Sequence, residues 1–179
     1  MLNYLDVSRN EITKIDDLAY LTNLETLIMK RNKLSKADSI ENLPLIPKLR
    51  ELDISLNKID CPPEGVLEIL SRCKSLRALT MMKNPIAKMP NYRKMVISRC
   101  RKLTSLDGKQ VCKEERRRCN VWGKVVMNGG SYEEANEADR QELLKIRSEQ
   151  SSANALRRSW HGSIHGSDDG STGGKLRKV

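Results

Sequence analysis

The stretch Leu2-Asn-Tyr-Leu5-Asp-Val7-Ser-Arg-Asn10-Glu-Ile12 decides the fold of this chain of 179 residues. Its apolar residues and its asparagine follow the spacing L-x-x-L-x-L-x-x-N-x-L at every specified position. The same spacing returns with its leading leucine at residues 24, 49 and 76, and a degenerate fifth copy begins at residue 103. Starts separated by 22, 25, 27 and 27 residues are typical of a solenoid, in which stacked repeats share one core.

Each position of the spacing has a physical reason. Alternate side chains of the L-x-L portion point to opposite faces of a short strand, so Leu27 and Met29 are expected in the core and Ile28 outside it. The asparagine stands where the chain leaves the strand, and its amide can pair backbone groups that a tight bend leaves without partners. We therefore expect a ladder of largely buried side chains formed by Asn10, Asn32, Asn57 and Asn84.

The segments that return from one strand to the next carry the other half of the core. Apolar residues at every third position, as in Ile40, Leu43, Ile46 and Leu49, predict tight 3-10 turns. The segment 62–70 is longer and more regular, which predicts an α-helix. The predicted fold class is α/β: a leucine-rich-repeat solenoid with one parallel sheet on the concave face, 3-10 and α turns on the convex side, and a helical C-terminal cap.

The net charge of +10 comes from one part of the chain. Residues 83–118 hold twelve basic and three acidic residues, and Lys124 adds one more positive charge. Aromatic residues make up 3% of the chain and there is no Phe. The stacking platform of single-stranded nucleic-acid binders is therefore missing, which argues against nucleic acid as a partner. The sequence shows neither a signal peptide nor eighteen consecutive apolar residues, which predicts no membrane partner.

Cysteine and histidine usage favours a binding module over an enzyme. The odd number of cysteines, without paired metal spacing, indicates a reducing compartment; they are Cys61, Cys73, Cys100, Cys112 and Cys119. His161 and His165 stand among Gly and Ser without further ligands. We therefore expect no catalytic residues, no metal, no cofactor and no small-molecule substrate.

The segment Asn84-Pro85-Ile-Ala-Lys-Met-Pro-Asn-Tyr92-Arg-Lys94, followed by Leu106-Asp107-Gly108, carries a family resemblance. It resembles the cap of short, phosphatase-regulator-like leucine-rich-repeat proteins, in which a helix with the Tyr-Arg pair seals the last repeat. The residue sequence of this segment is most similar to that of the axonemal dynein assembly factors with leucine-rich repeats. This resemblance implies cap roles for Pro85, Tyr92, Leu106, Asp107 and Gly108, and a site of action in the cytoplasm or at the axoneme of cilia and flagella.

The sequence predicts three regions. Residues 1–127 form the leucine-rich-repeat domain, with the cap from about residue 84. Residues 128–150 form a charged helix that opens with a capping box at Ser131 and Glu134. Residues 151–179 are rich in Ser, Gly and Asn, which predicts a disordered tail. The chain begins inside a strand, so we expect that repeats preceding it are missing.

Two surfaces are candidates for partner binding. On the concave face, outward residues of neighbouring strands should align in rows: Tyr4, Asp6, Thr26, Ile28, Lys30, Glu51, Asp53, Thr80 and Met82. The alternative is that these are ordinary solvated strand residues.

The second surface is a basic patch on the cap, suited to an acidic partner such as a dynein chain or a tubulin tail: Lys88, Arg93, Lys94, Arg99, Arg101, Lys102, Arg116, Arg117 and Arg118. The alternative is a solvated helix face, with Arg93 structural beside Tyr92. The family resemblance also implies a second cap helix after a turn at Leu106-Asp107-Gly108. We expect Arg116, Arg117 and Arg118 mainly on the solvent side of this helix, and Trp122 packed on the last repeat.

The leading hypothesis is a non-enzymatic scaffold that supports preassembly or docking of axonemal dynein arms. Its expected partners are dynein chains or assembly co-chaperones. Two alternatives remain open: a regulatory subunit that binds a phosphatase through the concave face, and an RNA-associated adaptor that uses the basic cap.

Overall fold

The computed structural model of the chain describes residues 2–16, 20–60 and 62–164, with side chains as far as residue 158. Cys61, His165 and the rest of the tail beyond residue 164 lie outside the described residues, and the side chain of His161 is not described. The chain divides into two compact units, Met1–Glu142 and Leu143–Val179. The first unit contains all the repeats and the cap, so every surface considered below belongs to it.

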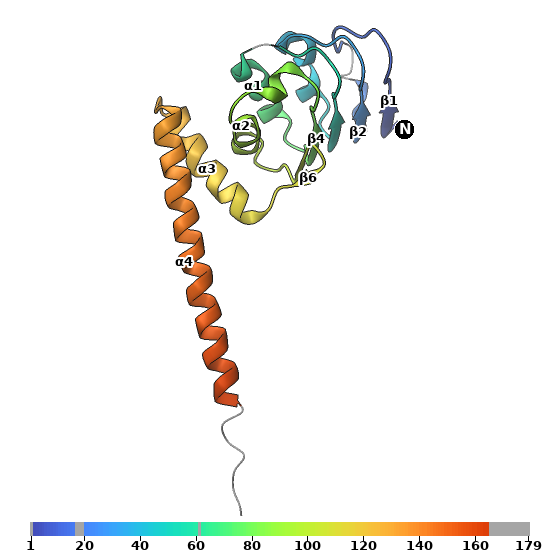
Figure 1. Ribbon diagram of the computed structural model, residues 1–179. Helices are drawn as coiled ribbons and strands as arrows, with labels where there is room; N and C mark the ends of the chain where they lie inside the picture. Colours follow the sequence, from blue (N-terminus) through green and yellow to red (C-terminus); the bar gives the residue numbers. More distant parts are fainter. Residues whose placement is uncertain (1, 17–19, 61, 165–179) are drawn as a thin grey trace, which may run out of the picture. The chain divides into compact units, whose positions relative to one another are not determined.

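Six short strands form one sheet. They are Tyr4–Asp6 (β1), Thr26–Ile28 (β2), Glu51–Asp53 (β3), Ala78–Thr80 (β4), Ser105–Leu106 (β5) and Lys109–Gln110 (β6). The first five run parallel, and each pairs with its neighbour in the sequence (Figure 1). Leu27, Leu52 and Leu79 occupy equivalent positions and are buried, which confirms the predicted solenoid and its register.

The return segments cover the other side of the sheet. Two of them contain the expected 3-10 helices: Ala37–Ile40 (η2) and Leu43–Leu45 (η3) lie between β2 and β3, and Pro85–Lys88 (η4) lies between β4 and β5. The longer return segment forms α1, Pro63–Arg72, which begins with a proline in its first turn and buries Val66, Leu67 and Leu70. Longer spacing between repeats thus gives an α-helix where shorter spacing gives 3-10 turns.

The sheet departs from an all-parallel arrangement at its last strand. Asp107 and Gly108 have φ angles of 53° and 76°, and two successive positive values are what a two-residue type I′ hairpin requires. The chain therefore folds back, and β6 pairs antiparallel with β5. The sequence predicted a turn at Asp107-Gly108 but not the strand that follows it.

Two helices form the cap: α2, Tyr92–Arg99, and α3, Lys113–Met127. They are packed on each other beside the last repeat (Figure 1). The buried face of α2 contains Met95, Val96 and Ile97, and that of α3 contains Cys119 and Trp122. These side chains continue the core of the repeats, so the cap covers apolar groups that the end of the solenoid would otherwise expose.

The last helix, α4, spans Tyr132–Ile164. Its start has the predicted capping box, because the Glu134 carboxylate accepts from the Ser131 amide at 2.8 Å and the Ser131 hydroxyl accepts from the Glu134 amide at 3.1 Å. The predicted end near Gln150 and the disordered tail from Ser151 are wrong as far as Ile164. Residues 151–158 contain neither Pro nor Gly and include Ala, Leu and Arg, which favour continuation of a helix.

No helix among residues 2–16, 20–60 and 62–164 combines the length and the apolar character needed to cross a bilayer.

Candidate functional site

Asparagine side chains hold the bends at which the chain leaves the sheet. Asn57 donates from Nδ2 to the carbonyl oxygens of Met29 and Ile54 at 3.0 Å, and its Oδ1 accepts from the Leu34 amide at 3.1 Å. Each amide therefore joins two neighbouring repeats, and Asn32 and Asn84 make the equivalent bonds.

Asn10 differs from the other three asparagines. Its Nδ2 donates to Val7 and Ser8 within its own repeat, and its side chain is exposed. The expectation that all four asparagines are buried is therefore wrong for this one. The reason is that burial of each amide requires a preceding repeat, and none precedes Asn10 among the described residues.

The residue before each ladder asparagine has a left-handed backbone. The φ angles of Arg9, Arg31, Leu56 and Lys83 lie between 56° and 62°, a region that costs a side-chain-bearing residue about 1 kcal/mol or more. The repeat imposes this conformation because the chain must turn sharply to bring the asparagine beneath the strand. The residue types at these positions show no preference for Gly, so the sequence contained no signal for it.

The strand register places the expected concave residues in rows. Tyr4, Thr26 and Glu51 align in one row, and another is formed by Asp6, Ile28, Asp53 and Thr80. Lys30 and Met82 lie just past the ends of their strands and are exposed. This face thus presents apolar groups and carboxylates within reach of one partner.

Exposure differs along these rows. Tyr4 and Met82 are 54% and 40% exposed, whereas Thr26, Ile28, Asp53 and Thr80 are half-buried. Large apolar side chains with this much exposure are available for contact with another protein.

Two of the concave carboxylates also stabilise their own strands. Asp6 and Asp53 accept hydrogen bonds at 2.8 Å from the amides of Ser8 and Ser55, two residues later. Hydrogen bonds from the Ser8 hydroxyl and amide lower the pKa of Asp6 below its ordinary value. Glu51, by contrast, is exposed and makes no side-chain hydrogen bond or ion pair within the described part of the chain.

The cap residue Asp107 extends this pattern. Its carboxylate accepts from the amides of Met81 and Met82 at 2.8 and 3.0 Å, so it pairs backbone groups at the end of β4 that no further parallel strand reaches. The resemblance to a cap motif indicated that Asp107 matters, but only the structure shows these bonds.

Arg93 is a structural residue of the cap. Its guanidinium contacts both carboxylate oxygens of Glu115, at 2.6 and 2.8 Å, and donates to the carbonyl oxygens of Leu106 and Gln110 at 3.1 Å. It thereby ties α2 to the β5–β6 hairpin and to α3. The hydrogen bond with Glu115 raises the pKa of Arg93 further.

Arg116 corrects the expectation that three consecutive arginines lie on the solvent side of α3. Its guanidinium donates to Ile97 and Cys100 at 3.2 and 3.3 Å and also to Leu103. Ile97 lies in the last turn of α2, where the carbonyl groups lack intrahelical donors, and Cys100 and Leu103 follow the helix. Arg116 therefore caps α2 from the neighbouring helix, a contact that sequence spacing could not indicate.

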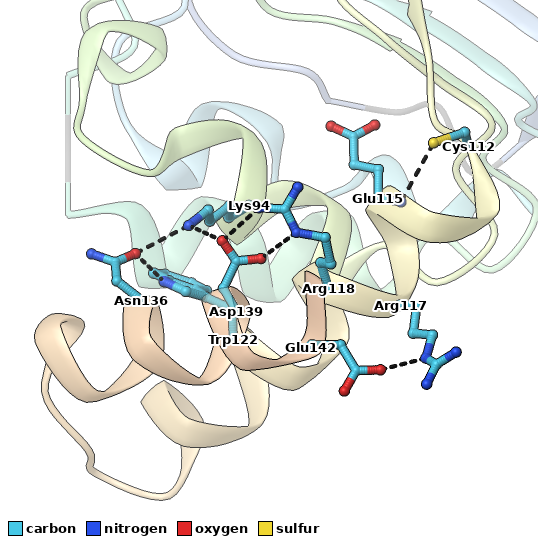
Figure 2. Close-up of polar contacts among 9 residues, drawn as sticks. All are labelled: Lys94, Cys112, Glu115, Arg117, Arg118, Trp122, Asn136, Asp139 and Glu142. Carbon is cyan, nitrogen blue, oxygen red and sulfur yellow. Dashed lines mark hydrogen bonds and ion pairs between the residues drawn. The ribbon is translucent and has the colours of Figure 1, made fainter. Parts of the chain in front are cut away.

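The other two arginines hold the first part of α4. Arg118 contacts Asp139 at 2.8 Å, Lys94 reaches the same carboxylate at 2.8 Å, and Arg117 pairs with Glu142 (Figure 2). Burial opposes ionisation of Asp139, but hydrogen bonds from Arg118 and Lys94 outweigh it and lower its pKa. Much of the predicted basic patch is thus engaged inside the unit.

Trp122 is buried, and its neighbours include α4 as well as the last repeat. Its ring stacks on that of Tyr132, with centroids 5.7 Å apart, and Lys94 lies 5.9 Å from the Trp122 ring centroid. The indole nitrogen donates to Asn136 Oδ1 at 3.0 Å (Figure 2). Trp122 is therefore packed in the core, as expected. Residues of α4 cover more of its ring than the sequence suggested.

The basic residues that remain are Lys88, Arg99, Arg101 and Lys102. None of them makes a side-chain hydrogen bond or ion pair with another described residue. The described part of the chain also contains no group of three or more His, Cys, Asp or Glu side chains arranged to hold a metal ion.

Comparisons with known proteins agree with the geometry. The leucine-rich repeat family matches residues 2–125. Dynein axonemal assembly factor 1 homologues of Aedes aegypti and Drosophila erecta are 35% and 33% identical over 64% and 69% of this chain. The chain spans only 9% and 8% of the length of those two relatives.

A second kind of relative is the U2 small nuclear ribonucleoprotein A′ of Arabidopsis thaliana, 32% identical over 63% of this chain and 44% of its own length. Among solved structures, a chain of the Drosophila melanogaster SNF/U2A′ complex gives a TM-score of 0.63 at 24% identity, over 71% of this chain and 74% of that one.

Proposed function

The chain belongs to the leucine-rich repeat family, and on that premise we propose that its concave sheet face binds a partner polypeptide during the assembly of axonemal dyneins. The partner is a dynein chain or a co-chaperone of its assembly. The place of action is the cytoplasm or the axoneme of cilia and flagella. Binding, and not catalysis, is the proposed activity.

The observation that carries this proposal is the composition of the concave rows. Tyr4 on β1 and Met82 just past β4 both expose large apolar surfaces, and the half-buried Ile28 lies on β2 between these strands. Aromatic and methionine side chains are enriched at the centres of protein interfaces. Glu51, with no partner of its own in the described part of the chain, adds a negative charge that selects a partner with a basic group at that position.

The link to dynein assembly depends on similarity. The relatives named as dynein axonemal assembly factor 1 homologues match 62–69% of this chain at 31–35% identity. Since this chain spans about a tenth of their length, the proposal concerns the repeat domain alone. The basic patch contributes less than the sequence suggested, because Arg93, Arg116 and Arg118 are occupied within the cap.

Co-purification from ciliated cells tests the proposal. We expect wild-type protein to recover axonemal dynein chains. A variant with Tyr4→Ser, Met82→Ser and Glu51→Lys should lose them while its circular dichroism and unfolding midpoint stay the same, because all three side chains are exposed.

The matched control changes exposed apolar residues outside the concave face. Leu45 and Met89 are 53% and 37% exposed, so Leu45→Ser with Met89→Ser removes similar apolar surface. This control should recover as much dynein as wild type. Equal recovery by the concave variant would reject the concave face as the binding surface.

A second candidate function comes from the ribonucleoprotein relatives. The U2A′-like proteins match at comparable identity and over a larger share of their own length, 44–46%. The same experiment separates the two functions. Recovery of U2 particle proteins through the concave face, in cells with and without motile cilia, would favour an adaptor in a ribonucleoprotein particle over a dynein scaffold.

A further inference from the structure

A cavity of about 460 Å³ opens between the C-terminal ends of α1, α2 and α3. Leu70, Cys73 and Leu76 contribute from α1 and the chain that follows it, Cys100 from the end of α2, and Met127 from the end of α3. This volume lies within the range of roughly 300–1,000 Å³ that is usual for ligand sites. The cavity is separate from the concave rows, none of whose residues lines it.

The rim of this cavity is cationic. Lys74, Arg99, Arg101 and Lys102 all line it, and no Asp or Glu does. None of these four side chains makes a hydrogen bond or an ion pair within the described residues. Their charges are therefore uncompensated by neighbouring carboxylates.

Helix capping accounts for basic residues at many helix ends, because cations interact favourably with terminal carbonyl groups. Here that role is already filled for α2. Arg116 donates to the carbonyl oxygens of Ile97 and Cys100, so Arg99, Arg101 and Lys102 are left available for another anion.

The apolar lining of the cavity comes from equivalent positions of two repeats. Cys73 and Cys100 each stand three residues before the leading leucine of the repeat that follows, and each accepts a backbone hydrogen bond from that leucine, at 3.2 and 3.1 Å. In earlier repeats the same position holds Leu21 and Ile46. Small side chains at the last two copies leave space where larger aliphatic groups stand elsewhere.

We propose that this cavity binds an acidic segment of a partner polypeptide, with one aliphatic side chain inserted between α1 and α2 and flanking carboxylates on the cationic rim. The positive charges of the rim favour a peptide with carboxylates on both sides of the inserted side chain. The aliphatic anchor follows from the leucine and cysteine lining. A nucleic acid fits less well, since no aromatic side chain lines the cavity on which a base could stack.

Fluorescence anisotropy with the purified full chain tests this proposal. The probe is a labelled peptide of glutamates around one central leucine, compared with a peptide in which alanine replaces that leucine. We expect the leucine peptide to bind, the alanine peptide to bind at least about tenfold more weakly, and rising salt to weaken both.

Two kinds of variant separate the rim from the cavity. Arg101→Glu with Lys102→Glu reverses the rim, and Lys58→Glu with Lys109→Glu makes the same change of charge at exposed positions elsewhere. Ser71→Trp and Met127→Trp fill the cavity from two sides without a change of charge. Binding should fall at least about tenfold in the rim variant, fall in both tryptophan variants, and stay near wild type in the Lys58 and Lys109 control.

Circular dichroism confirms folding of each variant before binding is compared. The proposal is overturned if the leucine peptide does not bind, if both tryptophan variants bind it as wild type does, or if the alanine peptide binds equally well. Tighter, rim-dependent binding of single-stranded polyuridine would assign the surface to RNA instead. Because the concave residues are unchanged in every variant, failure here leaves the dynein proposal untouched.

Discussion

Tyr92 shows how one residue type can combine a stabilising ring with a costly hydroxyl. The residue is half-buried against the core, and its hydroxyl oxygen is buried without a hydrogen-bond partner in the described structure. Burial, with the nearby Asp107 carboxylate, raises the pKa of Tyr92. The cap motif therefore depends on the ring.

Replacing Tyr92 by Phe should leave the free energy of unfolding unchanged or raise it by up to about 1 kcal/mol, because the unpaired hydroxyl is removed. Replacing it by Ala should lower that free energy by about 3 kcal/mol through lost packing. Urea denaturation measures both changes. A loss of more than about 1 kcal/mol in the Phe variant would mean that the hydroxyl has a partner.

The ladder asparagines should differ in their contribution to stability according to burial. Asn57→Ala should lower the free energy of unfolding by about 1 to 3 kcal/mol, because buried groups of two repeats lose their partners. Asn10→Ala should cost less than about 1 kcal/mol, since water replaces the lost bonds at this exposed position. Chemical denaturation of the two variants gives the comparison, and equal losses would contradict it.

Buried thiols make stability depend on pH in alkaline solution. Burial raises the pKa of Cys73 and Cys100 from 9.0 to about 12, and that of Cys119 to about 11. The unfolded thiols ionise near pH 9 and the folded ones only near pH 11 to 12, so the free energy of unfolding should fall as the pH rises through this window. Denaturation from pH 8 to 11 should show a shallower fall for Cys73→Ala with Cys100→Ala than for wild type.

At the scale of elements, the cap depends on contacts between its helices. Arg116 caps α2 from α3, and the pair of Lys94 and Arg118 holds Asp139 of α4. The basic residues of the cap therefore make hydrogen bonds and ion pairs within the protein as much as they provide a surface for partners.

Arg116→Glu should lower the free energy of unfolding by at least about 2 kcal/mol, because three carbonyl groups lose a charged donor and a carboxylate replaces it. Lys113→Glu changes the charge equally at an exposed position of the same helix and should shift stability by less than about 0.5 kcal/mol. Thermal unfolding followed by circular dichroism distinguishes the two. Equal midpoints would show that the Arg116 contacts do not stabilise the cap.

At the scale of the whole molecule, the first compact unit ends at Glu142, inside α4. Ala135 and Asp139 of this helix are buried, and Asn136 bonds Trp122. The first turns of α4 therefore belong to the repeat domain, although the sequence analysis placed residues 128–150 in a separate charged helix.

Truncation tests this boundary. A chain that ends after residue 150 should keep the unfolding midpoint of the full chain, whereas one that ends after residue 128 should unfold at a lower temperature. Both truncations remove Trp160, so Trp122 is then the only tryptophan. Its emission should shift to longer wavelength in the shorter chain, because Tyr132 and Asn136 no longer cover it, and an unshifted spectrum would contradict this assignment.

The sequence by itself determined the solenoid, its register and the position of its cap. Leu27 or Asn57 can be assigned from spacing because every repeat places the same residue type in the same local environment. Only the tertiary structure decided the roles of Arg116, Asp139 and the cavity beside Cys100. Those roles depend on contacts between helices far apart in the chain, where a basic residue on a cap helix can equally face solvent, a carboxylate or a bare carbonyl group.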